Sequence, residues 1–400
     1  MQYNKLIKAL NADLKQAPAT PLTALARRLI HGAVNFDLNK TQNLDVNFRI
    51  QNIQRDYNTP PVYTHESILG APYADHATQP LEAGEAWHKG RRASNTGLKY
   101  AFNASGQPIN PFMNTGLNGR GVLGQFGPNH AVDNGILRIK TNADGKNTLH
   151  AIGILRKFDN DAPALSGGFA KYSRNAKGAY IFDRAAMIET QCEELFEEMI
   201  SGSIDLISPY KERLAQAIQD EYDVRMAGRN GLALSAQQQH EIAEQVETAL
   251  KMEQVNALDP SFMTRLHDVV SKGHECFAGP MLNDNRSTNN AWIETRLSWF
   301  MISDDTWSFI KGPNPKFPYA FSAGDDASGV VEHELTPALI KTAFASHGAL
   351  FTFLGASYLL KMQSDGAVID GDIIAQMNDI ADYLDGFKSG FKPRPPQQQP

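Results

Sequence analysis

The spacing of apolar residues predicts helices in several parts of the chain. Apolar side chains recur every three or four positions from Ala185 to Met199, which predicts one helix with a buried face. Residues 208–272 are predicted to form three further helices, the second of which begins at a capping box of Ser235 and Gln238. Helices are also predicted within residues 1–35, 336–360 and 369–387.

Alternating or continuous apolar stretches predict the strands. Residues 43–50 alternate apolar and polar positions, residues 150–155 form a short continuous apolar run, and residues 291–302 are predicted to form a long strand. Residues 56–130, in contrast, are rich in glycine, proline, asparagine and aromatic side chains, which indicates irregular but ordered structure.

These patterns divide the chain into six parts. They are a helical extension (1–55), an irregular N-terminal lobe (56–148), the first part of a core (149–207), a helical insertion (208–272), the second part of the core (273–387) and a disordered Pro/Gln-rich tail (388–400). The insertion has no residue spacing typical of a metal or nucleophile site. We therefore expect it to cap the site, to bind a protein partner, or to be a neutral expansion.

Composition and charge exclude several classes of protein. Of the 400 residues, 42% are apolar and 20% are charged, which allows a buried core and excludes wholesale disorder. The net charge of −6 provides no basic field for a nucleic-acid backbone, so no nucleic-acid partner is expected. Only two cysteines are present, Cys192 and Cys276, which excludes a disulfide scaffold and a zinc site made of cysteines alone.

The sequence also lacks the usual targeting features. No apolar stretch approaches the roughly 18 residues of a membrane span. The N-terminal residues carry charges within their apolar stretch and no small-residue cleavage site, unlike a secretory signal. We therefore expect a cytoplasmic protein without a membrane span, with export by a non-classical route left open.

The strongest chemical signal is a trio of acidic residues on the helix predicted at 185–199. Glu194, Glu197 and Glu198 lie at positions i, i+3 and i+4, so they project from one face within a turn. A divalent cation would relieve their repulsion, and carboxylate oxygens suit Mg²⁺ or Mn²⁺. A solvated acidic face is the alternative. The upstream pair Gly167–Gly168 favours a metal site, because glycines let a loop fold closely over it.

A glycine-containing loop followed by this acidic helix resembles the Nudix box, G-x5-E-x7-R-E-U-x-E-E-x-G-U, in which U is apolar. Three longer stretches are similar to the mitochondrial ADP-ribose pyrophosphatases of the Nudix superfamily, and equally to the related domain of melastatin-type TRP channels. These stretches are GLNGRGVLGQFGPNH (116–130), RSTNNAWIET (286–295) and AGDDA (323–327). The resemblance covers approximately residues 56–200 and 275–355.

The resemblance implies an α/β Nudix fold, with a mixed sheet between helices, an irregular N-terminal lobe and a helical insertion. It implies hydrolysis of the pyrophosphate bond of ADP-ribose to AMP and ribose 5-phosphate, with Mg²⁺ or Mn²⁺. Glu194, Glu197 and Glu198 match the metal-binding glutamates of the box, and Glu194 and Glu198 are expected to be catalytic. A metal clamp would neutralise a pyrophosphate and help to activate water.

The chain departs from the box in the loop and at the helix. Glu193 replaces the box arginine, Ile200 replaces the box glycine, and Arg174 stands where the box has its upstream glutamate. In the family, this glutamate and arginine help to hold the loop against the helix. We hypothesise that Arg174 and Glu193 form the same pair with the charges exchanged, the alternative being that Arg174 is merely exposed.

Further candidates come from the longer stretches. Asp325 or Asp326 is expected to act as general base or extra metal ligand, unless the pair only forms a turn or a helix cap. The residues expected to bind substrate are Arg120, Asn129, His130, Asp133, Gly167, Gly168, Arg286, Asn290, Trp292 and Glu294.

The residue types in this second set suit a phosphorylated sugar. An arginine such as Arg286 can bind phosphate through two hydrogen bonds, and a glutamate such as Glu294 can accept hydrogen bonds from ribose hydroxyls. Strand alternation places Asn290, Trp292 and Glu294 on one face. Trp292 equally fits a core position, and His130 equally fits the role of a structural hydrogen-bond partner.

The sequence therefore predicts a Mg²⁺-dependent Nudix hydrolase that cleaves ADP-ribose. The three retained glutamates favour an enzyme, whereas the lost box arginine and upstream glutamate favour an ADP-ribose-binding module without turnover. A third alternative is a pyrophosphatase for another nucleoside-diphosphate sugar, a dinucleotide or an ADP-ribosyl conjugate.

Overall fold

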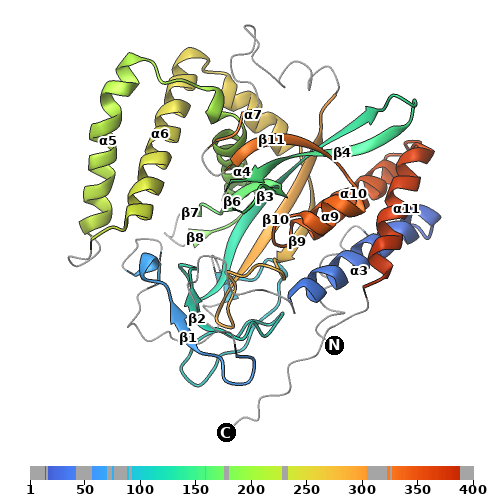
Figure 1. The fold of residues 1–400 in the computed structure, drawn as a ribbon, viewed down its shortest axis with the longest axis horizontal. Helices are drawn as coiled ribbons and strands as arrows, with labels where there is room; N and C mark the ends of the chain where they lie inside the picture. Colours follow the sequence, from blue (N-terminus) through green and yellow to red (C-terminus); the bar gives the residue numbers. More distant parts are fainter. Residues whose placement is uncertain are drawn as a thin grey trace.

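A mixed β-sheet between two layers of helices forms the centre of the molecule (Figure 1). The predicted α/β architecture is therefore confirmed. The structure, a computed structural model, describes residues 14, 17–41, 56–69, 74–75, 88–89, 92–157, 159–174, 180–227, 233–303, 322–324 and 327–387.

The sheet is built around two long strands that run parallel to each other, β3 (Gly127–Thr141) and β10 (Ala291–Met301). Its order is β11-β4-β3-β10-β9, with β5 paired to β4 and β6 paired to β3, and these remaining pairs are antiparallel. Strands β3 and β10 are buried over most of their length because helices cover both faces. The other strands are β4 (Asn147–Arg156), β5 (Ala162–Ala164), β6 (Ser166–Phe169), β9 (His274–Pro280) and β11 (Ala327–Glu334).

One face of the sheet is covered by helices from both ends of the chain. Helix α10 (His347–Ser364) is buried from His347 to Leu360, as expected for an element that is apolar all round. It packs against α3 (Pro21–Thr41), so the predicted N-terminal helix is part of the main hydrophobic core. Helices α9 (Pro337–Thr342) and α11 (Gly371–Asp385) complete this layer.

The opposite face carries the acidic helix. Helix α4 (Arg184–Met199) is the helix predicted from Ala185, and the Asp183 side chain caps it by accepting a 3.0 Å hydrogen bond from the backbone N–H of Ala186. Its apolar side, including Leu195 and Phe196, is buried in a second hydrophobic cluster on this face. The acidic side is thereby directed away from that cluster.

The insertion forms three helices, as predicted. They are α5 (Ser208–Ala227), α6 (Ala236–Leu258) and α7 (Phe262–Ser271), preceded by the short 3-10 helix η4 (Ser201–Ser203). The capping box of Ser235 and Gln238 is present at the start of α6. Helix α5 lies outermost, and α6 lies between it and the rest of the molecule (Figure 1).

The N-terminal lobe is mostly irregular, in agreement with its composition. It contains a parallel pair of short strands, β1 (Val62–Thr64) and β2 (Asn118–Gly121), and the 3-10 helix η1 (Glu66–Ile68). Farther along the chain, strands β7 (Ser173–Arg174) and β8 (Tyr180–Ile181) form a small antiparallel pair.

Three elements differ from the sequence-based expectation. Strand β3 already begins within the predicted N-terminal lobe, so the sheet starts earlier than residue 149. Gly167 and Gly168, expected in a loop, lie in strand β6 and pair with β3. The helix predicted at 336–360 is divided into α9 and α10, because Ala345 adopts a positive φ of 43° between them.

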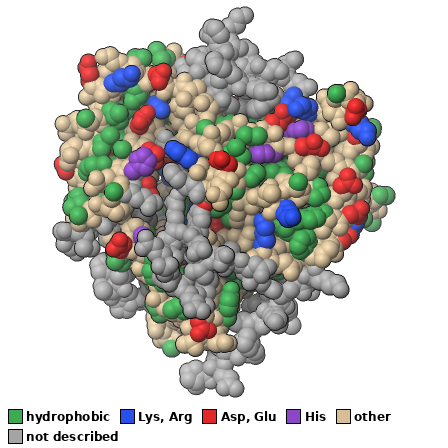
Figure 2. All heavy atoms as spheres, in the orientation of Figure 1, with side chains coloured by type: hydrophobic (Ala, Val, Ile, Leu, Met, Phe, Trp, Pro, Cys, Tyr) green, Lys and Arg blue, Asp and Glu red, His purple; other side chains and the backbone are tan. Residues whose placement is uncertain are grey.

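Some predicted features lie outside the described residues. They include the strand at 43–50, the beginning of the helical extension and the tail at 388–400. None of the described helices combines the length and the apolar composition needed to cross a membrane. On the face shown in Figure 2, acidic and basic side chains of the described residues are interspersed, without a broad basic patch.

Candidate active site

A pocket of about 550 Å³ lies beside the acidic side of α4. This volume is within the range of small-molecule sites, about 300–1,000 Å³. The pocket is bounded by α4, by strands β3 and β6, by the turn between α9 and α10, and by helix α6 of the insertion. The polar and aromatic residues that line it are Asp133, Arg156, Phe169, Lys171, Glu193, Glu194, Glu197, Glu198, Gln245, Thr248, Arg286, Phe344 and His347.

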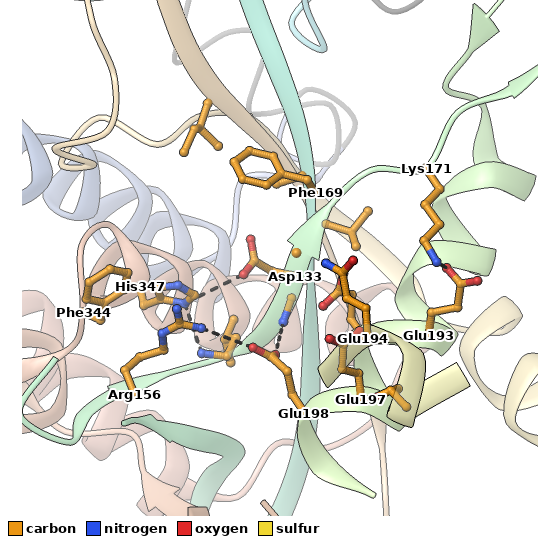
Figure 3. A pocket seen from close by; sticks show the side chains of 18 of the residues that line it. Asp133, Arg156, Phe169, Lys171, Glu193, Glu194, Glu197, Glu198, Phe344 and His347 are labelled. Atoms are coloured by element: carbon orange, nitrogen blue, oxygen red, sulfur yellow. Dashed lines mark hydrogen bonds and ion pairs between the residues drawn. The ribbon is translucent and has the colours of Figure 1, made fainter. Parts of the chain in front are cut away.

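Glu198 joins helix α4 to the glycine strand. Its carboxylate accepts hydrogen bonds from the backbone N–H of Gly167 (2.7 Å) and from Arg156 Nη1 (3.3 Å), as Figure 3 shows. The side chain is buried, and charge-assisted hydrogen bonds of this kind are stronger than neutral ones. Glu198 therefore holds β6, α4 and the end of β4 in one arrangement.

Glu194 is a carboxylate with a perturbed pKa. Burial, followed by the negative charges of Glu198 and Glu197, raises the pKa of Glu194 well above its usual value. A Cβ on Gly168 would overlap the carboxylate oxygens of Glu194. Glycine at this position therefore lets β6 approach the acidic helix closely, which is the role predicted for it.

The ion pair between loop and helix involves a lysine. Lys171 Nζ lies 2.8 Å from Glu193 Oε2 and joins the segment after β6 to α4 (Figure 3). The hypothesis assigned this partnership to Arg174, whose side chain lies outside the described residues. Among the described residues, Lys171 thus matches the negative charge at the box-arginine position, and the pairing of Arg174 with Glu193 stays a prediction.

The pocket also contains a cationic side. Arg156 lies beside Phe344, with its guanidinium carbon 5.5 Å from the centre of the ring. Arg286 donates two hydrogen bonds to Asp284, from Nε (2.9 Å) and from Nη2 (2.6 Å), and it lines the pocket. Such fixed guanidinium groups are suited to bind phosphate oxygens.

Asp133 and His347 form the floor of the pocket. Burial raises the pKa of Asp133 to about 7, although the Thr295 hydroxyl donates a 2.6 Å hydrogen bond to its carboxylate. Burial lowers the pKa of His347 to about 3, and its Nδ1 accepts a hydrogen bond from the Leu165 N–H (3.0 Å). His347 is therefore neutral at physiological pH, 3.9 Å from Asp133 Oδ1.

Six of the residues expected to bind substrate do not line this pocket. Glu294 is fully buried and accepts hydrogen bonds from Trp292 Nε1 (2.8 Å), Ser94 Oγ (3.0 Å) and the Asn95 N–H (2.5 Å). Trp292 occupies a core position, which was the alternative for it. The remaining four, Arg120, Asn129, His130 and Asn290, are buried and hydrogen-bonded to backbone atoms of the lobe.

Asp325 and Asp326 lie outside the described residues. The residues just before them are fixed to the end of α4. The Ser322 N–H donates to the Met199 carbonyl (2.7 Å), and the Gly324 N–H donates to the Glu198 carbonyl (3.0 Å). The AGDDA stretch therefore starts at the last turn of the acidic helix.

The carboxylates are close to one another but not arranged as a ready metal site. In the described part of the chain, no three His, Cys, Asp or Glu side chains are grouped so that they could hold a metal ion. The donor types nevertheless fit a hard divalent cation, because oxygen ligands predominate among the carboxylates of α4. Side chains of α4 would have to rotate to bind it.

Several pocket residues were not among those predicted from the sequence. Arg156, Lys171, Phe344 and His347 come from a strand end, a loop and a helix break, and none of them belongs to a recognisable motif. A cap over the site is one of the roles expected for the helical insertion, but the spacing of its residues does not indicate which helix face lines the pocket. These positions depend on tertiary packing, which local patterns do not report.

Similarity to known proteins agrees with the sequence resemblance. Residues 45–127 match the model of the family described as NUDT9-like, N-terminal domain. Mitochondrial ADP-ribose pyrophosphatase of Rattus norvegicus is 27% identical over 73% of this chain and 67% of its own length. The Caenorhabditis elegans protein provisionally named nudix hydrolase 6 is 30% identical over 36% of this chain and 52% of its own length.

A channel protein is also among the relatives. The transient receptor potential cation channel subfamily M member-like 2 of Nematostella vectensis is 27% identical over 56% of this chain, but over only 10% of the channel. The chain thus spans about half of the worm relative and a tenth of the channel. A solved mutT/nudix family protein from Listeria innocua covers 59% of this chain at a TM-score of 0.25 and 12% identity, too low to support an argument.

Proposed function

We propose, from the premise that this chain resembles the Nudix hydrolases and in particular mitochondrial ADP-ribose pyrophosphatase, that it hydrolyses the pyrophosphate bond of ADP-ribose with Mg²⁺ or Mn²⁺. The products would be AMP and ribose 5-phosphate. The observation that carries the proposal is one pocket lined by the carboxylates of α4, by Arg156 and Arg286, and by the glycine strand.

The charge pattern of the pocket suits a diphosphate and a cation together. Glu194, Glu197 and Glu198 are the residues that would hold the metal, which supplies charge neutralisation and an activated water when bound. Arg156, which also donates to Glu198, and Arg286 would bind phosphate oxygens. Asp325 or Asp326 remains the proposed general base, because its chain segment starts at the last turn of α4.

The first experiment measures AMP released from ADP-ribose and Mg²⁺ by chromatography, for the unaltered protein and for Glu194→Gln and Glu198→Gln. Both substitutions keep the size of the side chain and remove a charged ligand. We expect turnover to fall by about 100-fold or more, since such ligands contribute several kcal/mol. Glu189→Gln is the matched control, because Glu189 is an exposed residue on the same helix. Unchanged turnover in both pocket variants would contradict the metal assignment.

A binding module without turnover is the second candidate function. It is favoured by two observations: no ready metal group exists among the described residues, and Glu193 replaces the box arginine. Calorimetry with ADP-ribose, performed on the same samples, separates the two candidates. Saturable binding with no AMP formed over many hours would favour the module. Equal-concentration competition between ADP-ribose and other nucleoside-diphosphate sugars would identify the preferred substrate.

A further inference from the structure

Helix α6 of the insertion forms one wall of the pocket. Gln245, Thr248, Ala249 and Met252 all line it, and their spacing of three and four residues places them on one helical face. This face combines two polar side chains with a small and a flexible apolar one. The insertion is thus part of the site and not an appendage beside it.

The wall is fixed at both ends. Near the N-terminus of α6, Gln238 Nε2 donates a hydrogen bond to the Ser67 carbonyl in η1 of the lobe. Near the C-terminus, Gln254 accepts from the Ile207 N–H (2.7 Å) and donates to the Asp205 carbonyl (2.9 Å). Val255 is fully buried in the same apolar cluster as Phe196 of α4. Helix α6 therefore extends from the lobe to the core along the pocket.

Helix α5 supports the wall from outside. Arg213 forms a two-pronged pair with Glu253 of α6 at 2.9 and 3.1 Å. Arg225 Nη2 donates to Gln245 Oε1 (2.6 Å), which fixes the amide of Gln245 at the rim of the pocket. These contacts join the two helices on the side away from the core, so the wall does not depend on α6 alone.

We propose that this face of α6 sets the size of the group attached to the diphosphate, so that the site takes a nucleoside diphosphate bearing one small polar group. Larger ligands, such as dinucleotides or macromolecular conjugates, would collide with a wall that is tethered at both ends. The inference rests on the proposed function for the identity of the ligand. The inference goes beyond the proposed function because it assigns ligand specificity to the insertion.

Two substitutions change the wall in opposite ways. Ala249→Trp adds bulk at an exposed rim position, so the fold should tolerate it, and it should weaken ADP-ribose affinity at least tenfold. Met252→Ala removes bulk from a partly buried position and should lower the preference for ADP-ribose over NAD⁺ at least tenfold. Ala215→Trp and Val224→Ala are the matched controls, because both residues are exposed on α5.

Affinities are measured by calorimetry with ADP-ribose and NAD⁺ in the absence of metal, and kcat/KM is measured separately with Mg²⁺. The wall assignment is wrong if both pocket variants stay within twofold of their controls in affinity and in selectivity. If the unaltered protein binds ADP-ribose but forms no AMP, hydrolysis is excluded, and the affinities alone decide the role of the wall. If it binds neither nucleotide without metal and forms no AMP with Mg²⁺, both proposals are wrong.

Discussion

At the scale of single residues, the candidate site depends on close approaches that only certain side chains allow. The backbone of β6 lies against α4 because Gly168 has no Cβ, and Gly167 can donate its N–H to Glu198. Two carboxylates are thus held within one small region, where burial and mutual repulsion act on Glu194. Such perturbed groups in a cleft are typical of functional sites.

Gly168→Ala is expected to affect activity more than stability. The new Cβ would overlap the end of the Glu194 side chain, which is flexible and can move aside at little cost in unfolding free energy. Because the carboxylate would be displaced, we expect turnover of ADP-ribose to fall about tenfold or more. Gly371→Ala is the control, since a Cβ there meets nothing within 4 Å. A loss of stability without loss of turnover would contradict this role of Gly168.

Glu294 provides a pH-dependent test of how the interior is organised. Burial raises the pKa of Glu294 to about 7, above the value of 4.5 expected in the unfolded chain. Its contribution to the unfolding free energy is therefore complete below pH 4.5 and is lost as the pH rises through about 7. Glu294→Gln does not titrate, so its stability relative to the unaltered protein should increase between these limits.

The increase should be on the order of 3 kcal/mol, since one pKa unit corresponds to about 1.4 kcal/mol. Urea unfolding at pH 5 and pH 8 measures it, with Glu334→Gln at the exposed end of β11 as the control. If the stability of Glu294→Gln relative to the unaltered protein instead fell as the pH rises, the carboxylate would be held in its charged form. Its hydrogen-bond donors would then be Trp292, Ser94 and Asn95.

At the scale of elements, the helices could be predicted from local sequence patterns, whereas the central strand of the sheet could not. Apolar spacing and the capping box predicted α4 and α6 well, because amphipathic periodicity reports a face that packs. Strand β3 was missed because it is buried on both faces and carries Asp133 and Asn134, so it shows no simple alternation.

The break between α9 and α10 has a tertiary origin as well. The Ser346 hydroxyl accepts a hydrogen bond from the Asn283 N–H (2.8 Å), and Asn283 Nδ2 donates to the Ala345 carbonyl (2.9 Å). These contacts stabilise a turn where the apolar pattern predicts a continuous helix. The turn brings Phe344 and His347 to the pocket, so these two residues that local patterns missed reach the site through this interruption.

Ser235→Ala tests whether α6 is stabilised by its capping box. The Ser235 hydroxyl accepts from the Gln238 N–H, and its loss should cost about 1 kcal/mol. Hydrogen exchange should accelerate about fivefold in the first turns of α6 and remain unchanged in α4. Ser261→Ala is the comparison, since Ser261 precedes α7 without capping it through a side-chain hydrogen bond. Equal exchange in α6 before and after the Ser235 substitution would exclude this role for the cap.

At the scale of the whole molecule, the core and the insertion meet around one pocket, and the lobe supports the sheet outside it. The lobe is joined to the sheet through buried contacts: Trp292 packs edge-on against Tyr100, with ring centres 5.2 Å apart, and Asn290 bonds to the lobe backbone. The lobe residues of the long sequence stretches therefore build the interior that positions β10. Their resemblance to the family was correct as a guide to relationship, but it did not distinguish residues that shape the fold from residues that face the pocket.

The insertion shows in a second way that the sequence did not identify the residues facing the pocket. The helices of the insertion and the capping box of α6 could be predicted. The contact of α6 with the pocket could not, because Gln238 and Gln254 form hydrogen bonds with residues far away in the sequence. Across the molecule, elements with a local signature were predictable. The assembly of the candidate site was predictable only where the family resemblance supplied it, at Glu194, Glu197, Glu198, the two glycines, Asp133 and Arg286.

The most direct test of the account is anomalous diffraction from a crystal of the protein grown with Mn²⁺ and ADP-ribose under conditions that slow turnover. We predict a manganese peak within bonding distance of carboxylate oxygens of Glu194 and Glu198, with the diphosphate in contact with the metal, Arg156 and Arg286. A bound nucleotide with no manganese at these glutamates, or manganese and nucleotide elsewhere on the protein, would contradict the account.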